Sequence, residues 1–102
     1  MNSFQIRNIE YSAIRAYLKI IGNPHNSFES KLAAAIEDEL TPRQAQLTQL
    51  YYLKQMPMID IAKELNISVS TVSRTLKRAR IKLEKILKYS SEALLNAYDD
   101  MD

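Results

Sequence analysis

Residues 58–88 read MIDIAKELNISVSTVSRTLKRARIKLEKILK, and this stretch decides the fold of the chain. Residues 58–65 place apolar side chains at helical spacing, which predicts a helix of about two turns. A three-residue turn is expected next, because Asn66 tolerates a left-handed backbone and Ser68 is a good helix N-cap. A second, longer helix then runs to about Lys88. This order of elements is typical of a helix-turn-helix.

The apolar positions of this stretch indicate how its two helices pack. Ile61, Ala62 and Leu65 face inward from the first helix, and the small Ala62 allows the two backbones to approach each other. Ile67 fills the turn. The second helix buries a seam of residues spaced by three and four: Val72, Leu76, Ala79, Leu83 and Leu87. The opposite side of that helix is therefore left free.

The free side of the second helix is strongly basic. Residues 66–88 hold seven of the chain's fourteen lysines and arginines and a single acid, Glu84. Such a basic helix suits DNA, whose major groove is roughly 12 Å wide and admits only the leading turns of a helix that is about 30 Å long. We expect base contacts at four positions of those turns, which are Val69, Ser70, Ser73 and Arg74. Among them, only Arg74 can make a two-pronged contact with guanine.

The other polar and basic positions of this helix suit phosphates or solvent. We expect Thr71, Lys77 and Arg78 to contact the DNA backbone, where contacts set the register without reading sequence. A solvated face beyond the groove, which steers association, is expected for three lysines: Lys82, Lys85 and Lys88.

The composition predicts an all-α protein, a small helical bundle that contains the helix-turn-helix with its long C-terminal recognition helix. One glycine and three prolines leave few places for tight hairpins, and 102 residues suffice for one domain. The lack of cysteine excludes disulfides and thiolate metal sites. No apolar run has the length of a membrane span and no secretion signal begins the chain. We therefore expect a soluble, cytoplasmic protein without a cofactor.

Residues 4–21 predict a helix that is apolar on two sides. One stripe comprises Tyr11, Ile14, Tyr17, Leu18 and Ile21, and the other comprises Ile6, Ile9, Ala13 and Ile20. Such a helix needs two neighbours, which are either two parts of the core or the core and the second subunit of a homodimer. Gly22 and Pro24 end this helix.

Cap residues place the next two helices. Asn26 or Ser27 begins a helix whose inward face comprises Phe28, Leu32, Ala35, Ile36 and Leu40. Thr41 and Pro42 begin another helix, and Gln44 closes a capping box with Thr41. The core stripe of that helix is Leu47, Leu50 and Tyr51, and the sequence KQMP ends it.

Residues 40–87 resemble region four of bacterial sigma-70 family factors. The most specific parts of the resemblance are LTPRQ at 40–44, IAKELNIS at 61–68 and STVSRTLKRARIKL at 70–83. The resemblance implies that the second helix of the motif recognises the promoter −35 element. The residues that would face bases are Ser70, Ser73 and Arg74, and those that would face the DNA backbone are Thr71, Lys77 and Arg78.

The resemblance also implies a protein partner, RNA polymerase. The apolar faces of residues 28–53 would receive the flap tip of its β subunit. The sequence departs from the family pattern at four positions: Thr48 replaces an apolar residue, Gln55 and Asn66 replace glycines, and Pro57 replaces a Ser or Thr cap. Each departure is physically tolerable.

The chain is expected to form one domain, 1–102, in three parts. Residues 1–39 form N-terminal helices for a dimer or polymerase contact, and residues 40–88 form the helix-turn-helix. Residues 89–102 form a C-terminal short helix, or a continuation of the long one, with an acidic tail. The part before the resemblance is too short for the family's promoter-melting domain. We therefore expect a stand-alone transcription regulator that binds double-stranded DNA.

Other functional classes are also compatible with parts of the sequence. Quorum-type response regulators have a similar motif that begins with LTPR but lacks the RARIKL end found here. A protein-only adaptor that binds RNA polymerase or a sigma factor has no need of a cationic leading turn. Catalysis is not expected, because His25 lies in a turn and Asp60 and Glu64 share an exposed helix side.

Overall fold

The computed structural model describes the backbone of residues 3–99 and the side chains of residues 11–88. The elements of the described backbone are α1 (Ser3–Gly22), α2 (Ser27–Glu39), α3 (Pro42–Thr48), the π-helix η1 (Gln49–Leu53), α4 (Met58–Leu65) and α5 (Val69–Asp99). The predicted all-α class is confirmed. Every helix in this part of the chain is too short or too polar to cross a membrane.

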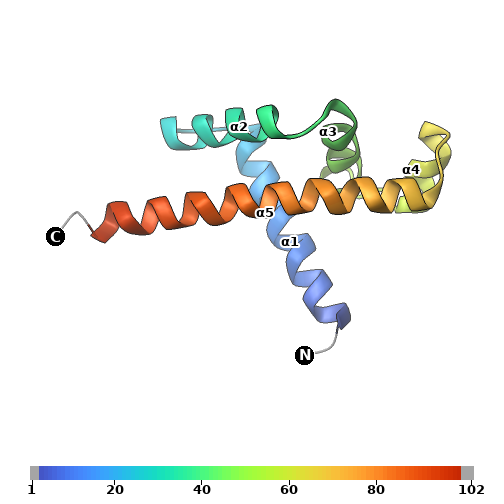
Figure 1. The fold of residues 1–102 in the computed structure, drawn as a ribbon, viewed down its shortest axis with the longest axis horizontal. Coiled ribbons are helices and arrows are strands. Elements are labelled where there is room, and N and C mark those ends of the chain that lie inside the picture. The colour runs from blue at the N-terminus through green and yellow to red at the C-terminus, as the bar shows by residue number, and fades with distance from the viewer. Residues whose placement is uncertain (1–2, 100–102) are drawn as a thin grey trace.

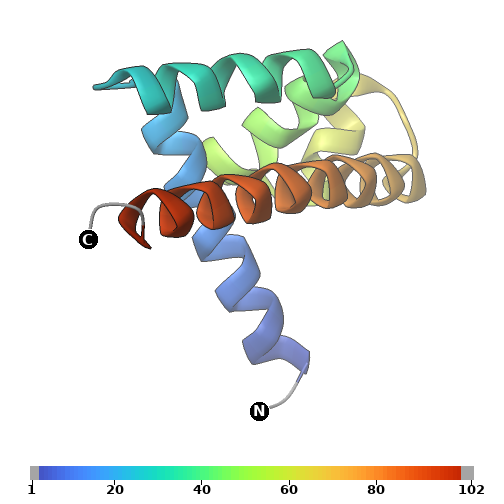
Figure 2. The same cartoon turned by 60° about the vertical axis from the view of Figure 1, so that its left-hand side comes forward.

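Helix α5 is the long axis of the molecule. Its 31 residues correspond to a length of about 46 Å, which accounts for most of the 53 Å long dimension of the structure. Helices α2, α3 and α4 pack along α5, with α4 at its N-terminal end (Figure 1). Helix α1 crosses the direction of α5 steeply, and its N-terminal half projects from the other helices in both views (Figure 1, Figure 2).

The predicted seam of α5 lies at the centre of the core. Val72, Ala79 and Leu83 are fully buried, and Leu76 is only 3% exposed. The cluster around this seam draws on every other helix: Ile14 and Leu18 from α1, Leu32 and Ile36 from α2, Leu47 from α3, Leu50 and Tyr52 from η1, and Ile61 and Ala62 from α4. At the last position of the seam, Leu87 is half-buried.

The predicted cap residues are confirmed. Asn26 caps α2, because its side-chain oxygen accepts a hydrogen bond from the Glu29 backbone N–H at 2.8 Å. Thr41 Oγ1 accepts from the Gln44 backbone N–H, and Gln44 Oε1 accepts from the Thr41 backbone N–H, both at 3.1 Å. Pro42 is the first residue of α3. These local interactions set where α2 and α3 begin.

The inward face of α2 is narrower than predicted. Leu32 and Ile36 are buried and Leu40 is half-buried, whereas Phe28 is 40% exposed and Ala35 is exposed. The reason is that residues one helical turn apart on the central line of the face, Leu32 and Ile36, already fill the contact with the core.

The end of the third predicted helix differs from the prediction. The last five residues of this helix, 49–53, form the π-helix η1, and the helical backbone ends after Leu53. The Lys54 backbone N–H donates to the Gln49 carbonyl at 3.0 Å, which is the five-residue spacing of a π-helix. The wider turn directs two consecutive tyrosines inward, and a pattern with helical periodicity did not predict the second of them, Tyr52.

Tyr11, Tyr51 and Tyr52 form a tyrosine cluster that attaches α1 to η1. The Tyr11 hydroxyl donates a hydrogen bond to the Tyr51 carbonyl at 2.9 Å. The ring centroids lie 5.2 Å apart for Tyr11 and Tyr51, 5.2 Å for Tyr11 and Tyr52, and 5.0 Å for Tyr51 and Tyr52. Aromatic pairs at such distances add to the stabilisation from buried area.

Helix α5 is longer than predicted. The prediction of a separate short helix within residues 89–102 is wrong, because the helical backbone of α5 continues from Val69 to Asp99. The continuation, our other expectation, is correct. No glycine or proline follows Asn66, so the sequence contains no strong helix breaker. The acidic side chains at the end of the chain lie outside the described residues.

The two apolar stripes of α1 have different surroundings. The first stripe packs on the core, with Ile14 and Leu18 buried and Tyr11, Tyr17 and Ile21 half-buried. In the second stripe, Ala13 is exposed and Ile20 is 46% exposed, while the side chains of Ile6 and Ile9 lie outside the described residues. Within the described structure, the second stripe therefore remains open to solvent at these two positions.

The four departures from the region four pattern have local consequences. Thr48 is buried, and its hydroxyl donates to the Gln44 carbonyl at 2.6 Å, which satisfies it. Pro57 precedes α4 without a side-chain cap. Asn66 and Gln55 have left-handed backbones with φ of 55° and 58°. Asparagine tolerates this conformation better than glutamine does, so the strain concentrates at Gln55.

We expect Gln55→Gly to raise the free energy of unfolding by about 1 kcal/mol, because glycine has no Cβ to oppose the left-handed backbone. The side chain of Gln55 is exposed, so little packing is lost. Urea unfolding monitored by circular dichroism would measure the change. Asn66→Gly is the matched control and should give a smaller gain. A lower midpoint for Gln55→Gly would contradict the expected strain.

Candidate nucleic-acid interface

Helices α4 and α5 are joined by a tight turn that begins at the left-handed Asn66. The Ile67 backbone N–H donates to the Ala62 carbonyl at 3.0 Å, which ties the turn back to α4. Ser68 precedes α5 and caps it, because its Oγ accepts a hydrogen bond from the Thr71 backbone N–H at 3.1 Å. Ala62 is buried, as expected for the residue where the two helices approach. The predicted short helix, turn and long helix are thus confirmed.

The leading turns of α5 present accessible side chains. Val69 is 44% exposed, and Ser70, Ser73 and Arg74 are exposed. A helix that reads bases needs such side chains on its first two turns, since only those turns enter a major groove. The four predicted base contacts are therefore free to meet a duplex, and their contact with bases remains a prediction.

The three predicted backbone contacts differ in accessibility. Lys77 and Arg78 are exposed. Thr71 is half-buried, and its hydroxyl lies 2.8 Å from Ser68 Oγ, with which it shares a hydrogen bond. Lys77 and Arg78 thus have the freedom that phosphate contacts require, while Thr71 already takes part in the N-cap of α5.

The cationic charge of the leading turns is not neutralised within the described part of the chain. No carboxylate there pairs with Arg74, Lys77 or Arg78. Glu84, the single acid of residues 66–88, lies further along the helix and pairs with Arg80, whose Nε is 3.6 Å from the Glu84 carboxylate. The positive field at the start of α5 is therefore available to an external polyanion.

Lys82 does not lie on the solvated face where it was predicted. Its ammonium donates to the Glu39 carbonyl at 2.9 Å and to Gln44 Oε1 at 3.0 Å. Gln44 is the capping-box residue of α3, so Lys82 joins α5 to the end of α2 and the start of α3. The long lysine side chain reaches these acceptors because α2 and α3 pack along α5. Lys85 and Lys88 are exposed, as predicted.

The structure also contains a cavity beside α5 that the sequence does not predict. Ser73 and Lys77 border a cavity whose opposite wall is the tyrosine cluster, and Arg80 also lines it. Helical periodicity assigns Arg80 only to the basic charge of α5, and it does not indicate Tyr52 because the π-helix changes the period of the chain. No group of three His, Asp or Glu side chains among the described residues could hold a metal ion.

The short α4, the left-handed turn and the exposed basic start of α5 define a helix-turn-helix module. Residues 32–83, half of the chain, match the family model described as sigma-70, region 4. The chain therefore belongs to the sigma-70 region 4 family, which links it to DNA binding and to transcription by RNA polymerase. A search of curated proteins and a search of solved structures each gave no match.

We expect Lys82→Met to lower the free energy of unfolding by about 1 kcal/mol. The substitution removes two hydrogen bonds from a charged donor and keeps a side chain of similar length. Urea unfolding would measure the loss. Lys85→Met removes the same charge from an exposed neighbour and should change stability little. Equal effects of the two substitutions would mean that the Lys82 hydrogen bonds do not stabilise the fold.

Proposed function

We propose that the protein is a sequence-specific transcription regulator that reads a promoter element with the leading turns of α5. The observation that carries this proposal is the exposure of Arg74, Lys77 and Arg78 with no carboxylate partner within the described part of the chain. Arg74 contacts a base, and Lys77 and Arg78 contact phosphates. The protein acts by binding, without catalysis, in the bacterial cytoplasm.

The proposal includes a contact with RNA polymerase through the surface of residues 28–53. Phe28 is 40% exposed at the start of α2, which supports an apolar partner surface there. The partner would be the β flap. Selection of bound sequences from random duplex DNA, with and without core RNA polymerase, tests both parts of the proposal, since a polymerase contact should sharpen or strengthen the selected sequence.

Two alternative functions are distinguished by the cations of α5. A response-regulator-type helix-turn-helix would also bind DNA, so the basic leading turns are compatible with it. A protein-only adaptor for RNA polymerase or a sigma factor would not need Arg74, Lys77 and Arg78 exposed together. These three side chains therefore favour a DNA-binding function over an adaptor.

We expect Arg74→Ala to relax base preference at one position of the site at a cost of about 1–3 kcal/mol, because a two-pronged base contact is lost. Lys77→Ala should instead weaken binding to all sequences alike, because it removes a phosphate contact. Gel-shift titrations with the selected site and with random duplex would separate these effects. An equal loss on both DNAs for Arg74→Ala would exclude a base-reading role.

The same titrations at two salt concentrations test whether the protein binds DNA through phosphate contacts. The two proposed phosphate contacts, Lys77 and Arg78, predict a log–log salt slope of about −2, which Lys77→Ala should flatten by about 1. Lys31→Ala removes an exposed positive charge from α2, away from the helix-turn-helix, and should leave the slope unchanged. A flat salt dependence of the unsubstituted protein would support the adaptor.

We further propose that α1 pairs two subunits through its second apolar stripe. The exposed positions of that stripe, Ala13 and Ile20, support this pairing. Light scattering at micromolar concentration should give twice the mass of the chain, and Ile20→Asp should give a monomer, because it places a charge in the interface. A monomer mass for the unsubstituted protein would reject the dimer. Half-sites of a dimer should lie about one helical turn of DNA apart, or a multiple of it.

A further inference from the structure

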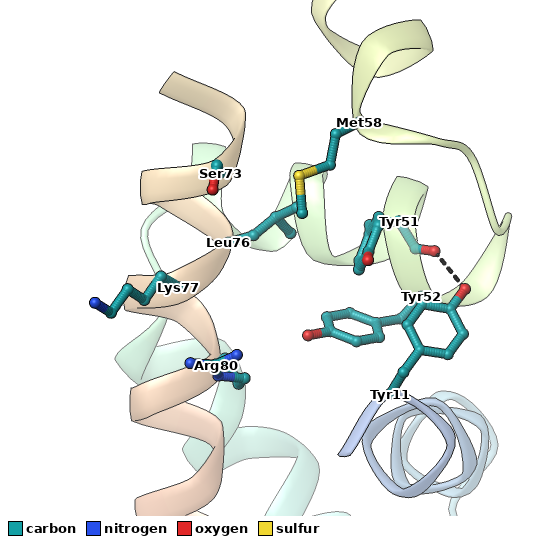
Figure 3. A pocket seen from close by; sticks show the side chains of 8 residues that line it. All are labelled: Tyr11, Tyr51, Tyr52, Met58, Ser73, Leu76, Lys77 and Arg80. Carbon is teal, nitrogen blue, oxygen red and sulfur yellow. Dashed lines mark hydrogen bonds between the residues drawn. The ribbon is translucent and has the colours of Figure 1, made fainter. Parts of the chain in front are cut away.

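The space between α5 and the tyrosine cluster is hollow. This cavity, which we call the tyrosine pocket, has a volume of about 390 Å³, within the roughly 300–1,000 Å³ range of small-molecule sites. The tyrosine cluster forms one wall, and Ser73, Lys77 and Arg80 line the other (Figure 3). Met58 and Leu76 add apolar surface between the two walls.

The aromatic wall of the tyrosine pocket is rigidly built. Tyr52 is 4% exposed, so its ring is held by the core. Tyr11 is held by its hydrogen bond to the Tyr51 carbonyl and stands edge-on to the Tyr51 ring, with an interplanar angle of 89°. Such a wall offers ring faces and ring edges at the same time, and both favour contact with another flat aromatic group.

The wall formed by α5 is cationic and polar. The residues that line the pocket, all of them in the described part of the chain, include no carboxylate. Figure 3 shows the Tyr52 ring extending toward α5 near Arg80, whereas the Lys77 ammonium points away from the tyrosines. Arg80 is therefore the principal cation of the pocket. Its planar guanidinium has five N–H donors and can bind more than one acceptor, including Glu84 and a ligand.

The pocket combines parts of the chain that lie inside and outside the family match. Residues 32–83 contain every lining residue except Tyr11, which α1 supplies. The attachment of α1 thus closes one side of a space that a region four module alone would leave open. The tyrosine pocket is consequently a feature of this chain as a whole.

We propose that the tyrosine pocket binds a small planar aromatic anion. The aromatic body packs against the tyrosine cluster, Met58 and Leu76 and extends toward Ser73, and its carboxylate accepts hydrogen bonds from the Arg80 guanidinium. Arginine suits this role because its planar donors match the two oxygens of a carboxylate. Neutral aromatic molecules lack the hydrogen bonds of the carboxylate, and aliphatic anions lack the packing against the tyrosine cluster.

Occupancy of the pocket weakens DNA binding, a consequence that rests on the proposed function. Ser73 borders the pocket and is also a predicted base contact, and the Lys77 stem borders it while the ammonium points to the exposed side of α5. A bound anion competes with a duplex for Ser73 and places a negative charge beside the phosphate-binding side of α5. Ligand and DNA therefore reduce each other's affinity by the same factor.

Binding of 2-naphthoate to the full chain, without DNA, tests the site. Titration followed by ¹⁵N–¹H NMR should give saturable one-to-one binding, with amide shifts centred on Tyr11, Tyr51, Ser73 and Arg80. Arg80→Gln should weaken the affinity about tenfold, the loss of one charge-assisted interaction. The matched control is Arg78→Gln, an exposed arginine of the same helix outside the pocket, which should leave the affinity unchanged.

Two further measurements keep this test decisive if Arg80→Gln unfolds the protein. Glu84→Gln removes the exposed carboxylate that competes for Arg80 and should strengthen 2-naphthoate binding about twofold. The neutral 2-naphthylmethanol should bind more weakly than 2-naphthoate. No saturable binding, equal affinity for both probes, or equal losses in Arg80→Gln and Arg78→Gln would each overturn the proposed anion site.

The DNA consequence is tested separately by gel shift. Arg78→Gln should lose DNA affinity and keep 2-naphthoate affinity, whereas Arg80→Gln should do the opposite. Added 2-naphthoate should weaken duplex binding by the unsubstituted protein and have no effect on Arg80→Gln. Ligand binding with unchanged DNA affinity would overturn the coupling. DNA binding that fails in every variant while 2-naphthoate still binds would reject the proposed function and leave the anion site established.

Discussion

The burial of one side of α5 is the constraint on which the rest of the structure depends. Val72, Leu76, Ala79 and Leu83 form a continuous seam against α2, α3 and α4, and no exposed charge interrupts it. Because a helix has a single axis, the burial of this seam determines which side chains point outward at every turn. The exposed position of Arg74 is thus a consequence of the burial of Val72 and Leu76 on the opposite side of the same helix.

Much of the fold could be predicted because local interactions determine several helix boundaries. The capping box of Thr41 and Gln44 and the left-handed Asn66 involve residues at most a few positions apart, so the sequence alone identifies them. The π-helix could not be predicted in this way, since it depends on how Tyr51 and Tyr52 meet Tyr11, forty residues earlier. The sequence also leaves the extent of α5 beyond Lys88 open, because it has no helix breaker there and no cap residue that marks an end.

The outward side chains of the candidate site could be predicted from the sequence, whereas its longer-range contacts could not. Helical periodicity separates the outward Arg74 and Arg78 from the buried seam, and the structure agrees with that separation. Periodicity does not reveal what a long side chain reaches, so the sequence predicts a solvated Lys82 although its ammonium contacts the end of α2 and the start of α3. It also does not reveal a cavity whose walls come from α1, η1 and α5, and Arg80 gained a specific place only from the three-dimensional arrangement.

The π-helix η1 makes the attachment of α1 sensitive to chain length. A π-helical turn holds one residue more than an α-helical turn, and the additional residue is what brings two neighbouring rings to the same side. Loss of a single residue between 49 and 53 would restore ordinary winding while leaving α3 and α4 in place, and one ring would then rotate outward. The composition of the segment would barely change, yet α1 would lose half of its aromatic anchor. A one-residue deletion would therefore weaken the attachment of α1 to η1, while Ile14 and Leu18 would still pack on the core.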